Sequence, residues 1–350
     1  MSTTTDEFAE RLFQASLGTI EVLSVHIGDR MGWYRALAAH GPAGPDELVA
    51  RAGGHERYAR EWLEQQAAYG ILEVAPDGRF VLPKGAAEVL TNEAGLAYLA
   101  PLARMLAGAA VQMPALLEAY RSGGGVGWAE FGPDVRESQA DMNRPWFEHA
   151  LPGALAGVPD LDAALRRPGA RIADVGCGGG WSTIALARAY PEAMVEGVDI
   201  DAPSIELAER NAAVSGLGER VSFRRVDAAA LGDGRYDAVF AFECVHDMPR
   251  PVDTLAAVRR AVVPGGPVVI MDEAVGESFA GPADDTERLM YGFSLLICLP
   301  DGMSEQPSAG TGTVLRPDTL RRYARAAGFG DIEVLPIEDF GFWRFYRLIP

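Results

Sequence analysis

The sequence predicts an α/β fold in which a mainly parallel sheet is covered by helices and preceded by a mostly α-helical segment. From about residue 160 onward, short apolar runs alternate with helically spaced ones, as in strands joined by crossover helices. The stretch Arg171 to Ser182, RIADVGCGGGWS, puts a glycine-rich turn between one such strand and a helix. Before residue 160 the periodicity is almost entirely helical.

The apolar runs predict seven strands, of which the first five alternate with helices and the last two form an antiparallel hairpin. A helix over 320–327 precedes that hairpin, in which Trp343 and Phe345 are most simply core residues. The predicted strands are 171–175, 194–198, 221–226, 236–242, 267–272, 332–337 and 342–348.

Composition and charge argue against two classes of partner. The 350 residues carry a formal charge of −18, and Lys84 is the only lysine. Sequence-independent binding to nucleic acid or to an anionic membrane requires basic surface, so neither is expected. The three cysteines are too few and too scattered for a disulfide framework. The start MSTTTDEF lacks the features of a signal peptide. No apolar run reaches the roughly eighteen residues that a membrane-spanning helix needs. A cytoplasmic location is therefore expected.

Residues 1–95 are predicted to form a winged-helix domain. Two helices are expected over residues 8–40, the second nearly apolar all round and suited to packing against the same helix of a second subunit. Pro45 opens another helix, Gly53 and Gly54 end it, and a further helix covers 56–69. A hairpin over 71–82 completes the pattern.

Charge disfavours DNA binding by this domain. Residues 1–95 contain 8 Arg and Lys against 14 Asp and Glu. The predicted recognition helix carries Glu56, Glu61 and Glu64 beside Arg57 and Arg60. Glutamates on such a helix are unfavourable opposite DNA phosphates. A role in dimerisation and in covering a substrate is expected instead.

The segment 96–158 is expected to be a helical linker and substrate lid. Helical residues over 88–120 are interrupted near Pro101 and Pro114, and the glycine-rich run 122–127 is expected to be a flexible link. Another helix is predicted over 134–156. Residues 159–350 then form the domain that contains the sheet.

The glycine turn is suited to holding a ligand, because glycines permit positive φ and close approach, and the following helix start offers unpaired N–H groups. A dinucleotide site typically reads G-x-G-x-x-G with an acid about twenty positions later. Here the order is D-x-G-x-G-x-G, with Asp174 before the first glycine and Asp199 at the end of the next strand. A carboxylate at Asp174 suits a cationic or amino-bearing ligand better than a pyrophosphate. A nicotinamide dinucleotide is the alternative.

Asp174 and the alternating glycines resemble motif I of the class I S-adenosylmethionine-dependent methyltransferases, and the run VEGVDID resembles their next motif. The turn from Ala261 to Gly266 is similar to the L-x-P-G-G turn of the same enzymes. The resemblance implies a Rossmann-like seven-stranded methyltransferase sheet, S-adenosyl-L-methionine as cofactor and S-adenosyl-L-homocysteine as product. It implies cofactor contacts from Asp174, Gly176, Cys177, Gly178, Gly180, Asp199, Ile200, Asp227, Ala228 and Phe242.

A winged helix ahead of such a domain is similar to caffeic-acid-type and bacterial natural-product O-methyltransferases, which implies a homodimer that acts on a small molecule. These enzymes carry a His-Asp pair after the fourth strand, matched here by His246 and Asp247, and the histidine is their general base. An unperturbed imidazole pKa of about 6.5 suits that task. Asp247 is expected to orient a neighbour, and Glu273 to hold His246. The alternatives are a loop histidine satisfied by backbone, and strand-end acids, Asp272 and Glu273, that cap the following turn.

The acceptor is expected to be small and hydrophobic or aromatic. In the resembling enzymes a helix near 134–156 and an insertion near 285–315 close over the substrate, although core packing would explain the same apolar side chains. Some C-methyltransferases of this architecture use a metal, but Ile297 stands where a histidine is expected and Cys298 does not complete a site, so no metal is predicted. The residues expected to line the acceptor site are Trp146, Phe147, His149, Met290, Tyr291, Phe293 and Ile297.

The sequence therefore favours methyl transfer from S-adenosylmethionine to an oxygen of a secondary metabolite, with His246 as base. Carbon or nitrogen acceptors, with or without a metal, would use the same scaffold. So would chemistry that keeps the bound cofactor without methylation, such as cyclisation or hydroxylation. A non-enzymatic alternative is a ligand-sensing regulator that uses the winged helix.

Overall fold

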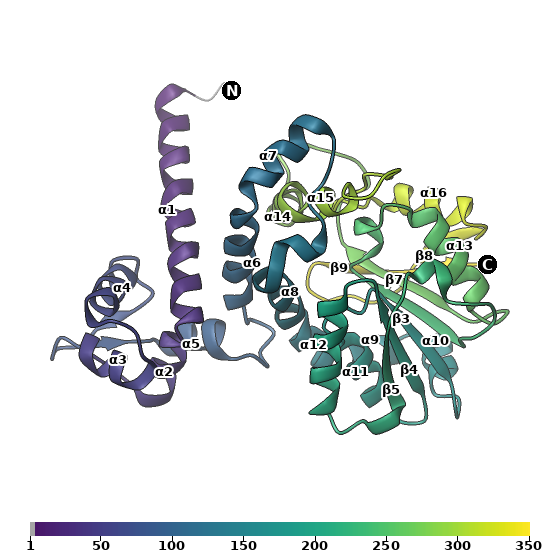
Figure 1. Ribbon diagram of the computed structural model, residues 1–350, viewed down its shortest axis with the longest axis horizontal. Helices are drawn as coiled ribbons and strands as arrows, with labels where there is room; N and C mark the ends of the chain where they lie inside the picture. The colour runs from purple at the N-terminus through teal and green to yellow at the C-terminus, as the bar shows by residue number, and fades with distance from the viewer. Residues whose placement is uncertain (1–3) are drawn as a thin grey trace. The chain divides into compact units, whose positions relative to one another are not determined.

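The structure is a computed structural model that describes residues 4–350, and the chain folds into two compact units (Figure 1). The winged-helix unit contains the described residues up to Gly108 together with Glu137–Pro145. The sheet unit contains Ala109–Arg136 and Trp146–Pro350. The segment 96–158, expected as a separate linker and lid, is divided between the two units. The first three residues of the start MSTTTDEF lie outside the described residues.

The winged helix forms where the sequence predicts it. Pro45 lies in the first turn of its first helix, and Gly53 follows that helix with a φ of +82°. In the second helix, the backbone N–H of Arg57 donates to the side chain of His55, which caps the helix. A two-stranded antiparallel sheet makes the wing. The elements are α1 (Thr5–Arg30), α2 (Trp33–His40), α3 (Pro45–Ala52), α4 (Glu56–Ala68), β1 (Glu73–Val74), β2 (Phe80–Val81), α5 (Lys84–Thr91) and α6 (Ala100–Val111).

Two helices cover residues 8–40, as predicted, but the expectation that the second is apolar all round is wrong. α2 has eight residues and is amphipathic: it buries Trp33 and Leu37 on one face and exposes Arg35 and His40 on the other. The exposed apolar surface lies on α1, whose first turns extend beyond α2–α4 (Figure 1). Its exposed apolar residues, 41–60% accessible, are Phe8, Leu12, Phe13, Ile20, Leu23 and Ile27.

The predicted breaks near Pro101 and Pro114 are confirmed, since these prolines lie at the starts of α6 and of α7 (Met113–Ser122). By length and apolar composition, no single helix between residues 4 and 350 could cross a membrane. Taken together, α6 and α7 are long and apolar enough to do so, but the pair is bent.

The run 122–127 is packed and does not form a free link. The backbone N–H of Val126 donates to the carbonyl of Pro300 (2.9 Å), and a side chain at Gly125 would collide with the same carbonyl.

The single helix predicted over 134–156 is interrupted. α8 (Trp128–Pro145) is kinked at Gly132, whose φ is +74°, and a π-helix then covers Trp146–Ala150. α9 (Leu151–Ala156) has a proline in its first turn. Periodicity alone does not show these breaks, because each segment keeps a helical apolar pattern on either side of them.

The sheet unit contains the seven predicted strands in the order β5-β4-β3-β6-β7-β9-β8. β9 runs antiparallel to β7 and β8, and the other neighbours are parallel. β6 is buried along its whole length, which explains its continuous apolar run. Trp343 and Phe345 of β9 are core residues, as predicted. The strands are β3 (Arg171–Val175), β4 (Met194–Asp199), β5 (Val221–Arg225), β6 (Ala238–Phe242), β7 (Val268–Glu273), β8 (Asp331–Val334) and β9 (Trp343–Ile349).

The carboxyl ends of β3, β4, β6 and β7 meet at one edge of the sheet, because these adjacent strands are parallel. This is the edge at which open α/β sheets bind ligands. The glycine turn follows β3, Asp199 ends β4, and the segment with His246 follows β6. Besides α7 and α9, the α-helices that lie wholly in the unit are α10 (Pro159–Leu165), α11 (Trp181–Ala189), α12 (Ala202–Ala213), α13 (Pro251–Ala261), α14 (Asp285–Phe293), α15 (Leu299–Gly302) and α16 (Pro317–Ala326).

Candidate active site

The turn between β3 and α11 requires glycine. Gly176, Gly178 and Gly180 have φ values of +68°, +50° and +77°, which are costly for other L-residues. A Cβ on Gly180 would lie 2.7 Å from the ring of Phe223, whereas one on Gly178 would meet no other described atom within 4 Å. The turn is therefore packed at Gly180 and open at Gly178, where a ligand can approach the backbone.

Asp199 holds the open side of this turn. One of its carboxylate oxygens accepts the N–H of Gly178 (2.9 Å), and the other accepts the N–H of Asp201 (2.9 Å). Burial raises the pKa of Asp199. Ile200, the next residue, is 61% exposed. The structure thus places Asp199, the last residue of β4, beside Gly178 and leaves the following Ile200 exposed.

Asp174 lies deeper than the sequence suggests. It is fully buried at the end of β3, and its Oδ2 accepts hydrogen bonds from Ser182 (2.6 Å) and Thr183 (2.5 Å) at the start of α11. Burial raises its pKa to about 6, although the two hydroxyls oppose that shift. Its other oxygen has no hydrogen-bond partner among the described residues. Asp174 therefore links the end of β3 to the start of α11 through hydrogen bonds. Only its Oδ1 is left to accept a hydrogen bond from another group.

The remaining expected cofactor residues follow neighbouring strands. Asp227 comes after β5 and caps a short helix by accepting the N–H of Ala229 (2.8 Å), and Ala228 beside it is buried. Cys177 in the turn and Phe242 at the end of β6 are also buried. Asn211 was missed by sequence reasoning: its side chain donates to the carbonyl of Gly179 (2.8 Å) and fixes the turn from α12.

His246 lies in a buried group of acids at the same edge. It is 3% exposed, in a short 3-10 helix after β6, and its Nδ1 is 2.9 Å from Oδ1 of Asp272. Glu273 Oε2 is 3.4 Å from Nδ1, and Asp247 Oδ1 is 3.4 Å from Nε2. The sequence predicted that Glu273 holds the imidazole. The structure shows a closer partner, Asp272, the residue before it at the end of β7.

These acids change the protonation of the imidazole. Burial alone would lower the pKa of His246, but the carboxylates of Asp247, Asp272 and Glu273 outweigh burial and raise it well above its usual value. Burial also raises the pKa values of Asp247 and Glu273. With Nδ1 directed at Asp272, a neutral His246 carries its proton on Nδ1 and presents the lone pair of Nε2.

Two further residues near this group were not predicted as functional. The carboxylate of Asp301 in α15 accepts the N–H of Trp128 (2.7 Å), and burial together with the charge of Asp247 raises its pKa to about 8. Cys298 has its Sγ within 4.8 Å of ligand atoms of both His246 and Asp247. Ile297, where a histidine was expected, is buried. Ile297 and Cys298 both belong to the π-helix Ser294–Cys298, a form that is frequent at functional sites.

The residues expected to line the acceptor site fall into several environments. Phe147 packs on Phe242 with ring centroids 5.3 Å apart, which joins it to the end of β6. Trp146 packs on Phe340 and Trp343, and His149 is exposed in the same π-helix. Met290, Phe293 and Ile297 are buried in α14 and in the π-helix that follows it. Tyr291 is 40% exposed and its hydroxyl accepts a hydrogen bond from Arg316.

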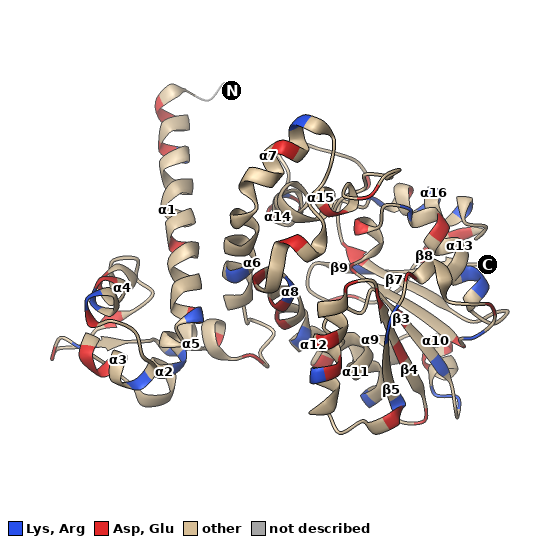
Figure 2. Cartoon of the chain, in the orientation of Figure 1, with Lys and Arg blue, Asp and Glu red and all other residues tan. Residues whose placement is uncertain are grey.

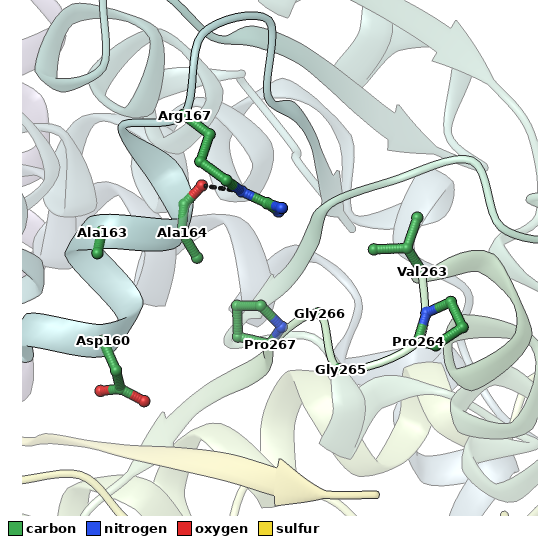
Figure 3. Close-up of a pocket in the computed structure, with 9 residues that line it drawn as sticks. All are labelled: Asp160, Ala163, Ala164, Arg167, Val263, Pro264, Gly265, Gly266 and Pro267. Atoms are coloured by element: carbon green, nitrogen blue, oxygen red, sulfur yellow. Dashed lines mark hydrogen bonds between the residues drawn. The ribbon is translucent and has the colours of Figure 1, made fainter.

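A hollow at the opposite edge of the sheet has different chemistry (Figure 3). It lies between α10 and the turn that leads into β7. Its guanidinium, on Arg167, is already paired with Asp237 (3.0 Å) and with the carbonyl of Ala164. The hollow therefore presents mostly backbone and small side chains. Its lining residues are Asp160, Ala163, Ala164, Arg167, Val263, Pro264, Gly265, Gly266 and Pro267.

Comparison with known proteins identifies the family. A family model for a methyltransferase domain matches residues 172–266, and one for an Rv2258c-like winged helix-turn-helix domain matches residues 19–92. The ubiquinone biosynthesis O-methyltransferase of Methylococcus capsulatus is 30% identical over 188 residues, which are 52% of this chain and 71% of that protein. The chain belongs to the class I S-adenosylmethionine-dependent methyltransferases. It is therefore a methyltransferase with S-adenosylmethionine as its cofactor.

Two other known proteins extend the likeness. The 27-O-demethylrifamycin SV methyltransferase of Amycolatopsis mediterranei is 34% identical over 164 residues, 45% of this methyltransferase and 58% of that protein. The fold of the whole chain is similar to that of human N-acetylserotonin methyltransferase, solved in complex with S-adenosylmethionine. That match has a TM-score of 0.72, covers 100% of this chain and 99% of the human one, and has 16% identity.

The described residues fit this cofactor. The backbone at Gly178 is open to a ligand, the Asp199 carboxylate lies beside it, and Ile200 is exposed next to that carboxylate. A carboxylate suits ribose hydroxyls as a hydrogen-bond acceptor. The acids around the site also suit a ligand that carries a positive sulfonium.

Proposed function

We propose that this methyltransferase transfers the methyl group of S-adenosylmethionine to a hydroxyl oxygen of a small, hydrophobic or aromatic secondary metabolite, with His246 as general base. The observation that carries the proposal is the buried pair of His246 and Asp272 at the same sheet edge as the glycine turn. Both curated relatives described above are named as methyltransferases that act on an oxygen, which supports an oxygen acceptor.

The chain's residues have distinct roles in this proposal. S-Adenosylmethionine supplies a methyl carbon on a good leaving group, so the protein must mainly align the reactants and remove the acceptor's proton. His246 Nε2 takes that proton. Asp272 accepts the N–H of Nδ1, which fixes the tautomer and stabilises the imidazolium that forms. Asp247 and Glu273 add negative charge on either side of the ring.

The cofactor and acceptor contacts complete the proposal. The ribose is assigned to Asp199, one face of adenine to Ile200, and the adenine edge to Asp227 and Ala228, with the glycine turn and Phe242 around the methionine portion. Phe147 supports an apolar acceptor because it packs on Phe242. The buried apolar side chains of Met290, Phe293 and Ile297 support the same acceptor class. Carbon and nitrogen acceptors would use the same arrangement.

His246→Ala tests the role of the base. Turnover is expected to fall about 10²-fold to 10⁴-fold, the usual contribution of a positioned base, while calorimetric affinity for S-adenosylmethionine stays within a few-fold. His40→Ala, which removes an exposed histidine of the winged-helix unit, is the control. Turnover of His246→Ala within a few-fold of the parent would remove His246 from the mechanism.

We also propose that the protein is a cytoplasmic homodimer that does not bind DNA. The exposed apolar residues of α1 support association with a second copy, since such faces usually mark contact surfaces. The two arginines of α4 each have a glutamate one turn away, Arg57 with Glu61 and Arg60 with Glu56, so negative charge on this helix would lie beside any DNA phosphate (Figure 2). All three cysteines are free thiols, which suits a reducing compartment.

A further inference from the structure

A buried ion pair joins α8 to the segment that follows Asp199. Arg136 of α8 donates from Nε to Oδ2 of Asp201 (2.7 Å), and the two side chains are only 10% and 7% exposed. Charged side chains are rarely buried to this extent unless an opposite charge meets them. Asp201 lies two residues after Asp199, and the proposed function gives Arg136 no role.

Asp201 connects Arg136 to Asp199 through its own backbone. Its Oδ2 also accepts the N–H of Ser204 (3.0 Å) and the hydroxyl of Ser204 (2.7 Å), so the side chain caps α12. Its backbone N–H donates to Oδ1 of Asp199 (2.9 Å). The other oxygen of Asp199 is held by the N–H of Gly178. The position of Asp201 therefore determines how one oxygen of Asp199 is held.

Charge gives Arg136 a second effect on Asp199. Burial raises the pKa of Asp199 and the negative charge of Asp201 raises it further, whereas the N–H groups of Asp201 and Gly178 lower it. The guanidinium of Arg136 pairs with the Asp201 carboxylate and offsets its charge. An ionised carboxylate accepts stronger hydrogen bonds from hydroxyls than a protonated one does. Asp199 is therefore better suited to ribose hydroxyls while Asp201 is paired with Arg136.

The part of α8 that belongs to the sheet unit, residues 128–136, is held at both of its ends. At the first end, the backbone N–H of Trp128 donates to the side chain of Asp301 (2.7 Å). At the other end, Arg136 pairs with Asp201. Gly132 interrupts the helix between these contacts with a φ of +74°. Glu137–Pro145 belongs to the winged-helix unit, so Arg136 is the last residue of α8 in the sheet unit.

We infer that Arg136 is a positioning residue for the cofactor: through Asp201 it holds Asp199 in place for the ribose, and it ties α8 to the cofactor site. The inference rests on the proposed assignment of the ribose to Asp199 and does not depend on the acceptor. Coupling between two binding events is reciprocal. Binding of S-adenosylmethionine and docking of residues 128–136 on the sheet unit therefore stabilise each other.

Arg136→Met tests the positioning role by calorimetric titration, because methionine keeps an unbranched side chain and removes the charge. The dissociation constant of S-adenosylmethionine is expected to rise at least about 5-fold, the lower end of typical coupling between sites. S-Adenosylhomocysteine should lose affinity by the same factor, since both ligands carry the ribose. If Arg136 acted only through its charge on the ligand, its loss would favour the sulfonium of S-adenosylmethionine over S-adenosylhomocysteine, and that result would overturn the inference.

Two further variants control this measurement. Arg136→Lys keeps a cation beside Asp201 and should recover most of the lost affinity. Arg347→Met removes another arginine that pairs with an aspartate in the sheet unit, since Arg347 of β9 binds both oxygens of Asp160 (2.7 and 3.0 Å). That pair lies near the amino end of β7, so affinity for the cofactor should stay at the parent value. Equal losses in Arg347→Met and Arg136→Met would overturn the inference.

Asp199→Asn shows whether Arg136 acts through Asp199. Alone it should weaken binding of S-adenosylmethionine, and adding Arg136→Met should then weaken binding by less than about 2-fold more, because effects that share one route do not add. Full additivity would overturn the inference. Weak binding by Asp199→Asn with parent affinity in Arg136→Met would overturn it and leave the ribose assignment standing. Parent affinity in Asp199→Asn would overturn both.

Hydrogen exchange in the unaltered protein tests the link to α8 without any substitution, so it decides the matter even if Arg136→Met does not fold. Saturating S-adenosylmethionine should slow amide exchange in residues 133–136 at least about 5-fold. Exchange in α10, which borders the opposite edge of the sheet, should change little. Thermal unfolding without cofactor shows which variants fold. Unchanged exchange in residues 133–136 would overturn the inference.

Discussion

Two glycines of the same turn are expected to respond differently to the same substitution. At Gly180 an added Cβ would lie 2.7 Å from Phe223 and 2.8 Å from Ala208, and the φ is +77°. At Gly178 the φ is also positive, +50°, but no other described atom lies within 4 Å of an added Cβ. The first position is closed by the protein's own core. The second is open.

The structure gives the size of each effect. A positive φ costs a residue with a Cβ roughly 1–2 kcal/mol, and an added methyl in a packed core costs typically about 1–3 kcal/mol more. Gly180→Ala should therefore lower the free energy of unfolding by about 2–5 kcal/mol, and Gly178→Ala by only about 1–2 kcal/mol. Because its methyl would fill the open space that we propose for the cofactor, Gly178→Ala should instead weaken S-adenosylmethionine binding by at least about 10-fold, or roughly 1.4 kcal/mol.

Chemical unfolding of both variants without cofactor measures the first effect, and calorimetric titration with S-adenosylmethionine measures the second. Each kcal/mol of lost stability corresponds to a fall in Tm of roughly 2–4 °C for a unit of this size. Equal stability losses in the two variants would refute the packing argument. Parent-like affinity in Gly178→Ala would place the cofactor away from the open side of the turn.

Two further predictions concern the base and the assembly. Because the surrounding carboxylates raise the pKa of His246, the imidazole is protonated and inactive at low pH, so kcat should rise with pH along a limb above pH 6.5. Glu273→Gln removes one of those charges and should shift this limb to lower pH; an unchanged limb in a pH-rate profile would count against the assignment. Leu12→Asp on the exposed face of α1 should convert a dimer to a monomer in sedimentation velocity, while Val214→Asp, at an 85% exposed position of the sheet unit, should not. A parent that is already monomeric would exclude the α1 contact.

The sheet and the glycine turn could be predicted because their signals are local. Buried parallel strands such as β6 read as continuous apolar runs, and positive φ at Gly176, Gly178 and Gly180 requires the residue type that the sequence shows. The winged helix was found for the same reason. Pro45, Gly53 and the turn before β2 mark element ends with residues whose backbone preferences are strong.

The chemistry around His246 was only partly predictable, because it depends on which side chains meet across the fold. Asp272 and Glu273 are adjacent, and only the packing of β7 against the segment after β6 decides that Asp272 is nearer Nδ1. Cys298 comes from a π-helix far along the chain, and its contact with the His246 and Asp247 pair depends on how that helix packs. Asp174 was expected to contact the ligand, but its Oδ2 accepts hydrogen bonds from two hydroxyls at the start of α11.

The central claim, methyl transfer to oxygen, is tested most directly with S-adenosylmethionine that carries a 13C-labelled methyl group. The protein is incubated with a panel of small hydroxylated aromatic and apolar acceptors, and the products are examined by carbon NMR for the atom to which the label is bonded. The account predicts a labelled methyl on oxygen, with one equivalent of S-adenosylhomocysteine per product, and its loss in His246→Ala. A label found on carbon or nitrogen, or cofactor consumed without a methylated product, would contradict it.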